Sequence, residues 1–138
     1  MTKKILIVDD EPHMLRVTEL SLKKLGFDIL TARNGDEAIQ IAQRDLPVLI
    51  VMDVVMPQKD GLSALKELKA IPATAQIPVI MLTTRGQNIT RTEAEGLGAA
   101  LYLTKPFSPS ALASEARQII EAGAVSYTHL TLPTIYSV

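Results

Sequence analysis

Short apolar runs rich in β-branched residues alternate along this chain with longer segments of helical spacing. The runs cover residues 5–8, 29–31, 48–52, 78–82 and 100–103. Each run is short and is followed by turn residues, which is typical of a strand buried in a parallel sheet. This alternation constrains the fold more than any other feature of the sequence.

The segments between the runs favour helices. Helices are expected over residues 12–25, 36–44, 61–70, 87–97 and 109–123. Pro12 suits a first helical position, Ser108 suits an N-cap, and Gly123 suits a helix end. The order βαβαβαβαβα predicts an α/β fold, namely a single doubly wound (βα)5 domain whose parallel five-stranded sheet is covered by helices on both faces.

Composition excludes several classes of protein. Apolar residues make up 47% of the 138 residues, which is enough for a core and excludes a disordered chain. The formal net charge of −1 gives no support to a basic nucleic-acid surface or a polybasic membrane patch. With no cysteine and two histidines, disulfides and Cys- or His-based metal sites are not expected. The apolar stretches are shorter than a membrane span, and no signal peptide is expected, so a cytoplasmic location is predicted.

The last 15 residues differ in style from the rest. Residues 124–138 contain no Asp, Glu, Lys or Arg and hold two of the three tyrosines. An added strand, a linker and a segment foreign to the domain all remain open for this tail. We expect residues 1–123 to form the domain and residues 124–138 to lie outside its core.

Polar residues gather at the expected strand ends. Asp9 and Asp10 follow the first run, Asp53 the third, Thr83 the fourth and Lys105 the fifth. In open parallel sheets, sites form beyond the carboxyl ends of the strands, so these side chains are expected to converge. Taken singly, each has an ordinary explanation as a turn former, a helix start or a solvated loop.

The joint pattern has a chemical interpretation. Clustered carboxylates repel one another unless a cation joins them, and Mg²⁺ suits carboxylates, waters and a phosphate. A lysine and a hydroxyl would complete a group of side chains that stabilises charge on a transferring phosphoryl group. Asp53 stands alone in an apolar strand and is therefore the candidate for the carboxylate that is itself phosphorylated.

At this point the chain resembles a response regulator receiver domain of two-component signalling. The residues that carry the resemblance are Asp9, Asp10, Asp53, Met56, Pro57, Asp60, Gly61, Thr83, Tyr102, Lys105, Pro106 and Phe107. Each motif is weak alone, but the ordered set is specific, with Thr83 lying 30 residues and Lys105 lying 52 residues after Asp53. The resemblance covers about residues 3–122 and implies the flavodoxin-like strand order 2-1-3-4-5.

The resemblance also implies a phosphoacceptor switch rather than an enzyme. Asp53 would accept a phosphoryl group from a sensor histidine kinase or phosphotransfer protein, and the domain would promote its own phosphorylation and dephosphorylation. Asp10, Asp53 and the backbone carbonyl of Val55 would bind Mg²⁺, with Asp9 supporting the metal through water.

Three further residues would carry the switch. Lys105 would pair with a phosphoryl oxygen, and Thr83 would donate a hydrogen bond to another. Tyr102 would turn inward and change the face made by the fourth helix, fifth strand and fifth helix, which a downstream output protein or domain would read. Thr84, Arg85 and Leu101 depart from the commonest family pattern and leave phosphorylation kinetics and partner choice open.

Other functions remain as alternatives. The chain could be the receiver half of a truncated DNA-binding transcription regulator, or a chemotaxis-type receiver that works alone. A haloacid-dehalogenase-like phosphohydrolase is disfavoured, because that family carries a second Asp two residues after its nucleophile, where this chain has Val55. We expect no membrane partner, no nucleic-acid binding by this chain alone, and a monomer, with phosphorylation-dependent dimerisation left open.

Overall fold

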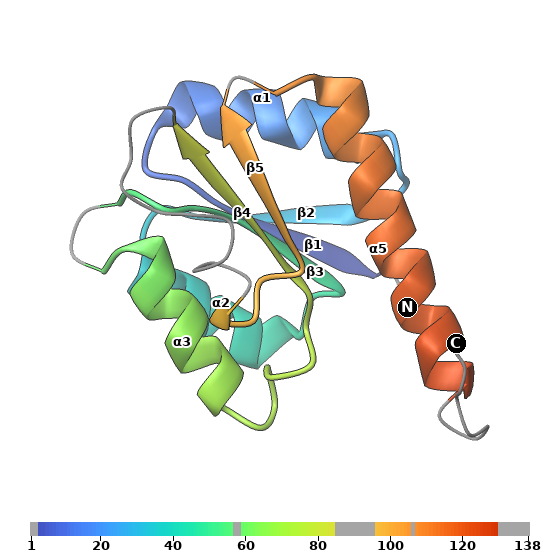
Figure 1. Ribbon diagram of the computed structural model, residues 1–138. Helices are drawn as coiled ribbons and strands as arrows, with labels where there is room; N and C mark the ends of the chain where they lie inside the picture. The colour runs from blue at the N-terminus through green and yellow to red at the C-terminus, as the bar shows by residue number, and fades with distance from the viewer. Residues whose placement is uncertain (1–2, 57–58, 85–95, 106, 130–138) are drawn as a thin grey trace.

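The sheet of this protein has five parallel strands in the order β2-β1-β3-β4-β5 (Figure 1). The computed structural model describes residues 3–56, 59–84, 96–105 and 107–129. Its strands are β1 (Lys4–Val8), β2 (Asp28–Ala32), β3 (Leu49–Asp53), β4 (Val79–Thr84) and β5 (Leu101–Lys105). The predicted fold class and strand order are confirmed.

In the part of the chain that the structure describes, four helices cover the sheet in two layers. They are α1 (Pro12–Lys23), α2 (Gly35–Asp45), α3 (Gly61–Ala70) and α5 (Pro109–His129). Because successive strand residues point to opposite faces, the sheet feeds two separate cores. One core packs under α2 and α3, and the other packs under α1 and α5. Figure 1 shows α1 and α5 on one side of the sheet and α2 and α3 on the other.

The strands in the middle of the sheet are buried on both faces. In β3, Ile50 and Met52 belong to the core under α2 and α3, whereas Leu49 and Val51 belong to the core under α1 and α5. All four side chains are fully buried. This double burial explains why the strands read as continuous apolar runs instead of alternating ones.

Most of the predicted boundaries are shifted by one or two residues from those observed, and the end of the fifth helix is shifted by six. The first helix ends at Lys23, and the fifth strand runs from Leu101 to Lys105, so Lys105 closes the strand instead of following it. The fifth helix was expected to end at Gly123, but it continues to His129. A glycine inside a helix costs only about 1 kcal/mol relative to alanine, and alanines flank this one on both sides, so the helix continues through it.

Part of the sequence prediction lies outside the described residues. This holds for nearly all of the helix expected over residues 87–97 and for residues 130–138 of the tail. Within the described part of the chain, no helix is both long and apolar enough to cross a bilayer.

Candidate metal centre

Three aspartates meet at the carboxyl edge of the sheet. Asp53 is the last residue of β3, and Asp9 directly follows β1, the strand paired with β3 in parallel. Asp9 and Asp53 are buried, whereas Asp10 is exposed. One carboxylate oxygen from each of the three lies within 4.8 Å of the others. The convergence expected from the strand ends is therefore present.

Lys105 supplies the positive charge of this site. Its Nζ lies 3.1 Å from Oδ2 of Asp9 and 3.4 Å from Oδ2 of Asp53. The lysine side chain is only 11% exposed, so the two ion pairs are largely shielded from water. β5 is separated from β3 by β4, and the long lysine side chain spans that distance at the strand ends.

The electrostatics of Asp53 favour a bound cation. Burial is the largest effect and raises the pKa of its carboxyl group, while the ammonium of Lys105 lowers it. The neighbouring charge of Asp9 raises this pKa further, and a backbone hydrogen bond from Val55 lowers it. The net effect is a raised pKa, which means that one lysine does not fully compensate two buried carboxylates.

Asp9 is fixed by its own hydrogen bonds. The backbone N–H of Glu11 donates to Oδ1 of Asp9 at 3.0 Å, and Lys105 donates to the other oxygen. The backbone N–H of Asp9 donates to the carbonyl of Ala32 at 3.1 Å. Both carboxylate oxygens of Asp9 thus have partners, while Asp10 beside it faces solvent.

The loop after Asp53 folds back tightly onto the strand end. The N–H of Gly61 donates to the carbonyl of Val54 at 2.7 Å. A Cβ atom at position 61 would lie 2.2 Å from the carbonyl oxygen of Asp53, so glycine is required by this close approach. Asp60 caps α3 by accepting a hydrogen bond from the N–H of Ser63 at 2.8 Å. Asp60 and Gly61 therefore shape the loop that carries Val55.

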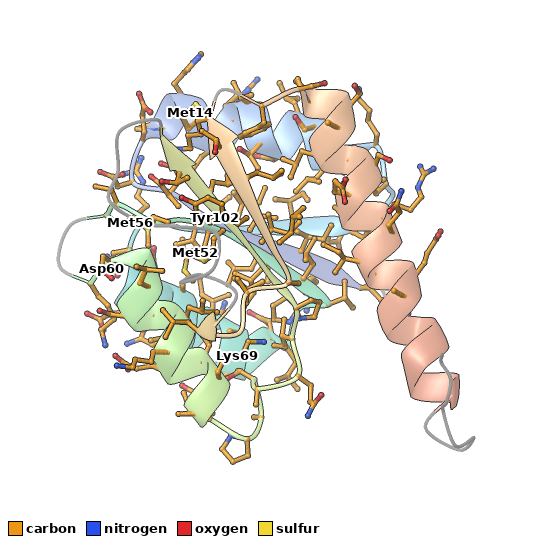
Figure 2. All side chains as sticks on the ribbon, viewed as in Figure 1. Met14, Met52, Met56, Asp60, Lys69 and Tyr102 are labelled. Carbon is orange, nitrogen blue, oxygen red and sulfur yellow. The ribbon has the colours of Figure 1, made fainter. Side chains whose placement is uncertain are left out.

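The two switch candidates lie on neighbouring strands. Thr83 is 1% exposed near the end of β4, one residue beyond the partner of Asp53 in the sheet register. Tyr102 lies in β5 opposite Met81 and packs, partly buried, against the core under α2 and α3. Met52 and Met56, labelled with Tyr102 in Figure 2, belong to that core. Arg85 and the side chain of Thr84 lie outside the described residues.

The donor atoms of this site fit a hard divalent cation. Every candidate ligand is a carboxylate or carbonyl oxygen, the type that Mg²⁺ prefers, and exposed Asp10 leaves room for metal-bound water. The carboxylates that could hold such an ion are those of Asp9, Asp10 and Asp53.

Sequence reasoning missed one residue of this region, Lys59. Its ammonium forms ion pairs with Asp36 of α2, at 3.2 Å, and with Glu67 of α3. The partners lie 23 residues before and eight residues after Lys59, and no motif links them. Only the packing of α2 beside α3 brings the three side chains together.

Comparison with known proteins agrees with the geometry. Residues 5–126 match the profile of the response regulator receiver domain. The alkaline phosphatase synthesis transcriptional regulatory protein PhoP of Bacillus subtilis is 35% identical over 126 residues, which cover 91% of this chain and 52% of that protein. The protein named probable transcriptional regulator ycf27 in Porphyra purpurea is 37% identical, over 95% of this chain and 53% of its own length. The chain spans about half the length of these curated relatives.

Solved structures give the same result. The chemotaxis protein CheY4 of Vibrio cholerae is 29% identical, with a TM-score of 0.78 over 86% of this chain and 99% of that one. A CheY-like receiver domain protein of Methanospirillum hungatei, at 22% identity and a TM-score of 0.83, shares the fold. The family profile, the relatives and the acidic site lead to one conclusion: this chain belongs to the response regulator receiver domain family.

Proposed function

We propose that this receiver accepts a phosphoryl group on Asp53 in a Mg²⁺-dependent reaction and thereby switches its contacts with an output partner. The observation that carries the proposal is the meeting of Asp53 with Asp9, Asp10 and Lys105 at one edge of the sheet. The ionised carboxylate of Asp53 can act as the nucleophile. Its neighbours can stabilise the negative charge that the phosphoryl group brings to the site.

The covalent step forms one bond and breaks one. A carboxylate oxygen of Asp53 attacks the phosphorus of a phosphohistidine on a sensor histidine kinase or phosphotransfer protein. The P–N bond breaks, and its electron pair stays on the departing imidazole nitrogen, which takes up a proton from solvent. Bound Mg²⁺ would supply positive charge to the phosphoryl oxygens. Asp10, Asp53 and the Val55 carbonyl would hold it, and Asp9 would support it through water.

Lys105 and Thr83 would respond to the new charge. The ammonium of Lys105 now pairs with Asp9 and Asp53, so a phosphoryl oxygen added to Asp53 would offer it a stronger partner. The Thr83 hydroxyl would donate to a second phosphoryl oxygen. Tyr102 lies in the same strand as Lys105, so a shift of that strand end would reach the tyrosine and bias the face of β5 and α5.

The relatives favour a transcriptional output for the whole protein. The two curated relatives described above are named a transcriptional regulator and a transcriptional regulatory protein, and this chain spans about half of each. We propose that this receiver controls such an output, whether in the same polypeptide or in a partner, and that it does not bind nucleic acid by itself. It would act as a monomer or as a phosphorylation-dependent dimer. Its cytoplasmic location stays a prediction.

The residue at position 55 argues against a phosphohydrolase. Val55 occupies the position where a haloacid-dehalogenase-like enzyme carries its acid/base aspartate, so no such group follows Asp53. We therefore expect no catalytic hydrolysis of small phosphoesters.

The test is phosphorylation by a small-molecule donor. Incubation with acetyl phosphate and Mg²⁺ should add the mass of one phosphoryl group, and Asp53→Asn should abolish the gain. Asp28→Asn is a matched control, because Asp28 is an exposed carboxylate. It lies at the amino end of β2, whereas the acidic site lies at the carboxyl ends of the strands. No mass gain in the wild-type protein, or an equal gain in Asp53→Asn, would contradict the proposal.

A further inference from the structure

A three-way ion pair lies beside the candidate metal centre but outside its ligands. Lys59 belongs to the loop between β3 and α3, the same loop that carries Val55. Its ammonium lies 3.2 Å from Oδ1 of Asp36, in the first turn of α2, and also contacts Oε2 of Glu67 in α3. The Lys59 side chain is 22% exposed, but those of Asp36 and Glu67 are 58% and 48% exposed, so this contact among three elements is open to solvent on its acidic side.

The backbone of Lys59 is tied to the same place. The N–H of Gly35, at the start of α2, donates to the Lys59 carbonyl at 3.3 Å. A Cβ atom at position 35 would lie 2.8 Å from both the carbonyl oxygen and Cγ of Lys59. Main chain and side chain of Lys59 therefore both rest on the beginning of α2. This second contact is independent of the ion pairs and points to the same anchoring.

Hydrogen bonds and burial also hold the described residues of this loop next to the site. At one end, the Val54 N–H donates to the Leu82 carbonyl at 2.9 Å, and at the other the Gly61 N–H donates to the Val54 carbonyl. Val54 and Met56 are each 7% exposed and belong to the core under α2 and α3, whereas the side chain of Val55 between them is 56% exposed. Lys59 is the described residue of this loop that ties it by ion pairs to α2 and α3.

We propose that Lys59 is a positioning residue, which holds residues 54–56 in the arrangement that binds the metal by tying their loop to α2 and α3. The role of the loop in metal binding rests on the proposed function, whereas its anchoring by Lys59 does not. Surface ion pairs contribute little individually and are screened by salt, so the expected effect is modest and salt-dependent.

The experiment compares matched lysine variants. Lys59→Met removes the ammonium and keeps most of the apolar stem, and Lys59→Arg restores the charge. Lys66→Met is the control, because Lys66 is exposed on α3 and forms no ion pair with the residues that the structure describes. Two quantities are measured, namely amide hydrogen exchange at Val54, Val55 and Gly61 without metal, and the Mg²⁺ dissociation constant by calorimetry.

For Lys59→Met we expect exchange at these amides about two- to fivefold faster and Mg²⁺ binding weaker by about the same factor at low salt. Lys59→Arg should stay within about twofold of the wild type, and Lys66→Met should not differ from it. The effect of Lys59→Met should shrink in roughly 0.5 M NaCl, where the screening length is about 4 Å.

A backbone variant tests the second contact. Gly35→Ala places a methyl group against the Lys59 carbonyl and should speed exchange at the same amides, whereas Gly96→Ala meets no described atom within 4 Å and should not. Unchanged exchange at Val54, Val55 and Gly61 in both Lys59→Met and Gly35→Ala would overturn the inference, even if the melting temperature falls. Failure of the wild-type protein to bind Mg²⁺ would count against the proposed function instead, and exchange would still decide the role of Lys59.

Discussion

Asp53 is a carboxylate that the fold buries at a cost in stability. Because its pKa is raised in the folded protein, the native state binds more protons than the unfolded chain between the ordinary value of 3.8 and the raised value. The free energy of unfolding therefore falls as the pH rises through that window, and the loss persists at neutral pH. Removing the charge of Asp53 should therefore restore the free energy of unfolding that is lost at neutral pH.

We predict that Asp53→Asn melts about 2–5 °C higher than the wild type at neutral pH in EDTA. The difference should shrink as the pH is lowered toward 3.8, because the wild-type carboxyl then becomes neutral too. Thermal melts across this pH range provide the measurement, with Asp28→Asn as the exposed control. A lower melting temperature for Asp53→Asn at neutral pH would show that the Lys105 ion pair outweighs the burial.

Bound magnesium should offset the destabilisation caused by the buried carboxylate of Asp53. A cation bound only by the folded state at 100 times its dissociation constant raises the free energy of unfolding by about 2.7 kcal/mol. We predict that Mg²⁺ raises the melting temperature of the wild type and of Asp28→Asn, and raises that of Asp53→Asn much less. Equal stabilisation of all three would remove Asp53 from the metal site.

At the scale of elements, a second lysine fixes the connection between α3 and β4. The ammonium of Lys69 donates to the carbonyls of Ala75 and Ile77 at 3.1 Å and 2.7 Å. A Cβ on Gly98, just before β5, would lie 3.1 Å from Cγ of Lys69. Burial lowers the pKa of this lysine, so the fold accepts a desolvated ammonium to close the loop.

We predict that Lys69→Met lowers the free energy of unfolding by about 1–2 kcal/mol, because two part-buried carbonyls lose a charged donor. Methionine keeps the stem that faces Gly98, so the loss reports mainly on the hydrogen bonds. Lys66→Met, on the exposed face of the same helix, should stay within about 0.5 kcal/mol of the wild type. Urea titration measures both, and an equal loss in the two variants would disprove the special role of Lys69.

The sequence predicted some of these features because they are local and missed others because they are not. The apolar run that became β3 and the acidic residue that ends it are adjacent in sequence, so both the strand and the position of Asp53 could be read directly. The roles of Lys59 and Lys69 depend on loops brought close by helix packing, which no periodicity encodes. The predicted end of α5 at Gly123 is wrong, because a single glycine between two alanines does not stop a helix.

At the scale of the whole molecule, the sheet order explains why the site could be anticipated. β1 and β3 are neighbours at the centre of the sheet, so the residues that end them must meet once the strands run parallel. Lys105 arrives from the edge strand β5, and its contact with Asp9 joins residues 96 positions apart. The fold thus brings Lys105 to the carboxyl ends of β1 and β3, whose position follows from the strand order.

The same architecture indicates how much of the chain the fold needs. α5 contributes Leu112 and Ala116 to the core under α1 and α5, and its Ile119 and Ile120 pack against that core. Beyond position 120, the side chains that the structure describes are those of Glu121 and Ala122, and both are exposed. We predict that a chain ending at Gly123 folds, melts within about 4 °C of the full-length protein and binds Mg²⁺ with unchanged affinity.

A shorter chain provides the contrast. Ending the protein at Arg117 removes Ile119 and Ile120 and should lower the melting temperature clearly, because each buried aliphatic side chain contributes about 1.5–3 kcal/mol when fully buried and these two are partly so. Circular dichroism melts of the full-length protein and of the chains ending at Gly123 and Arg117 measure these differences in melting temperature. If the chain ending at Gly123 fails to fold while the full-length protein is stable, then the last turns of α5 and the uncharged residues after it belong to the domain, and residues 124–138 support the packing of α5 on the sheet.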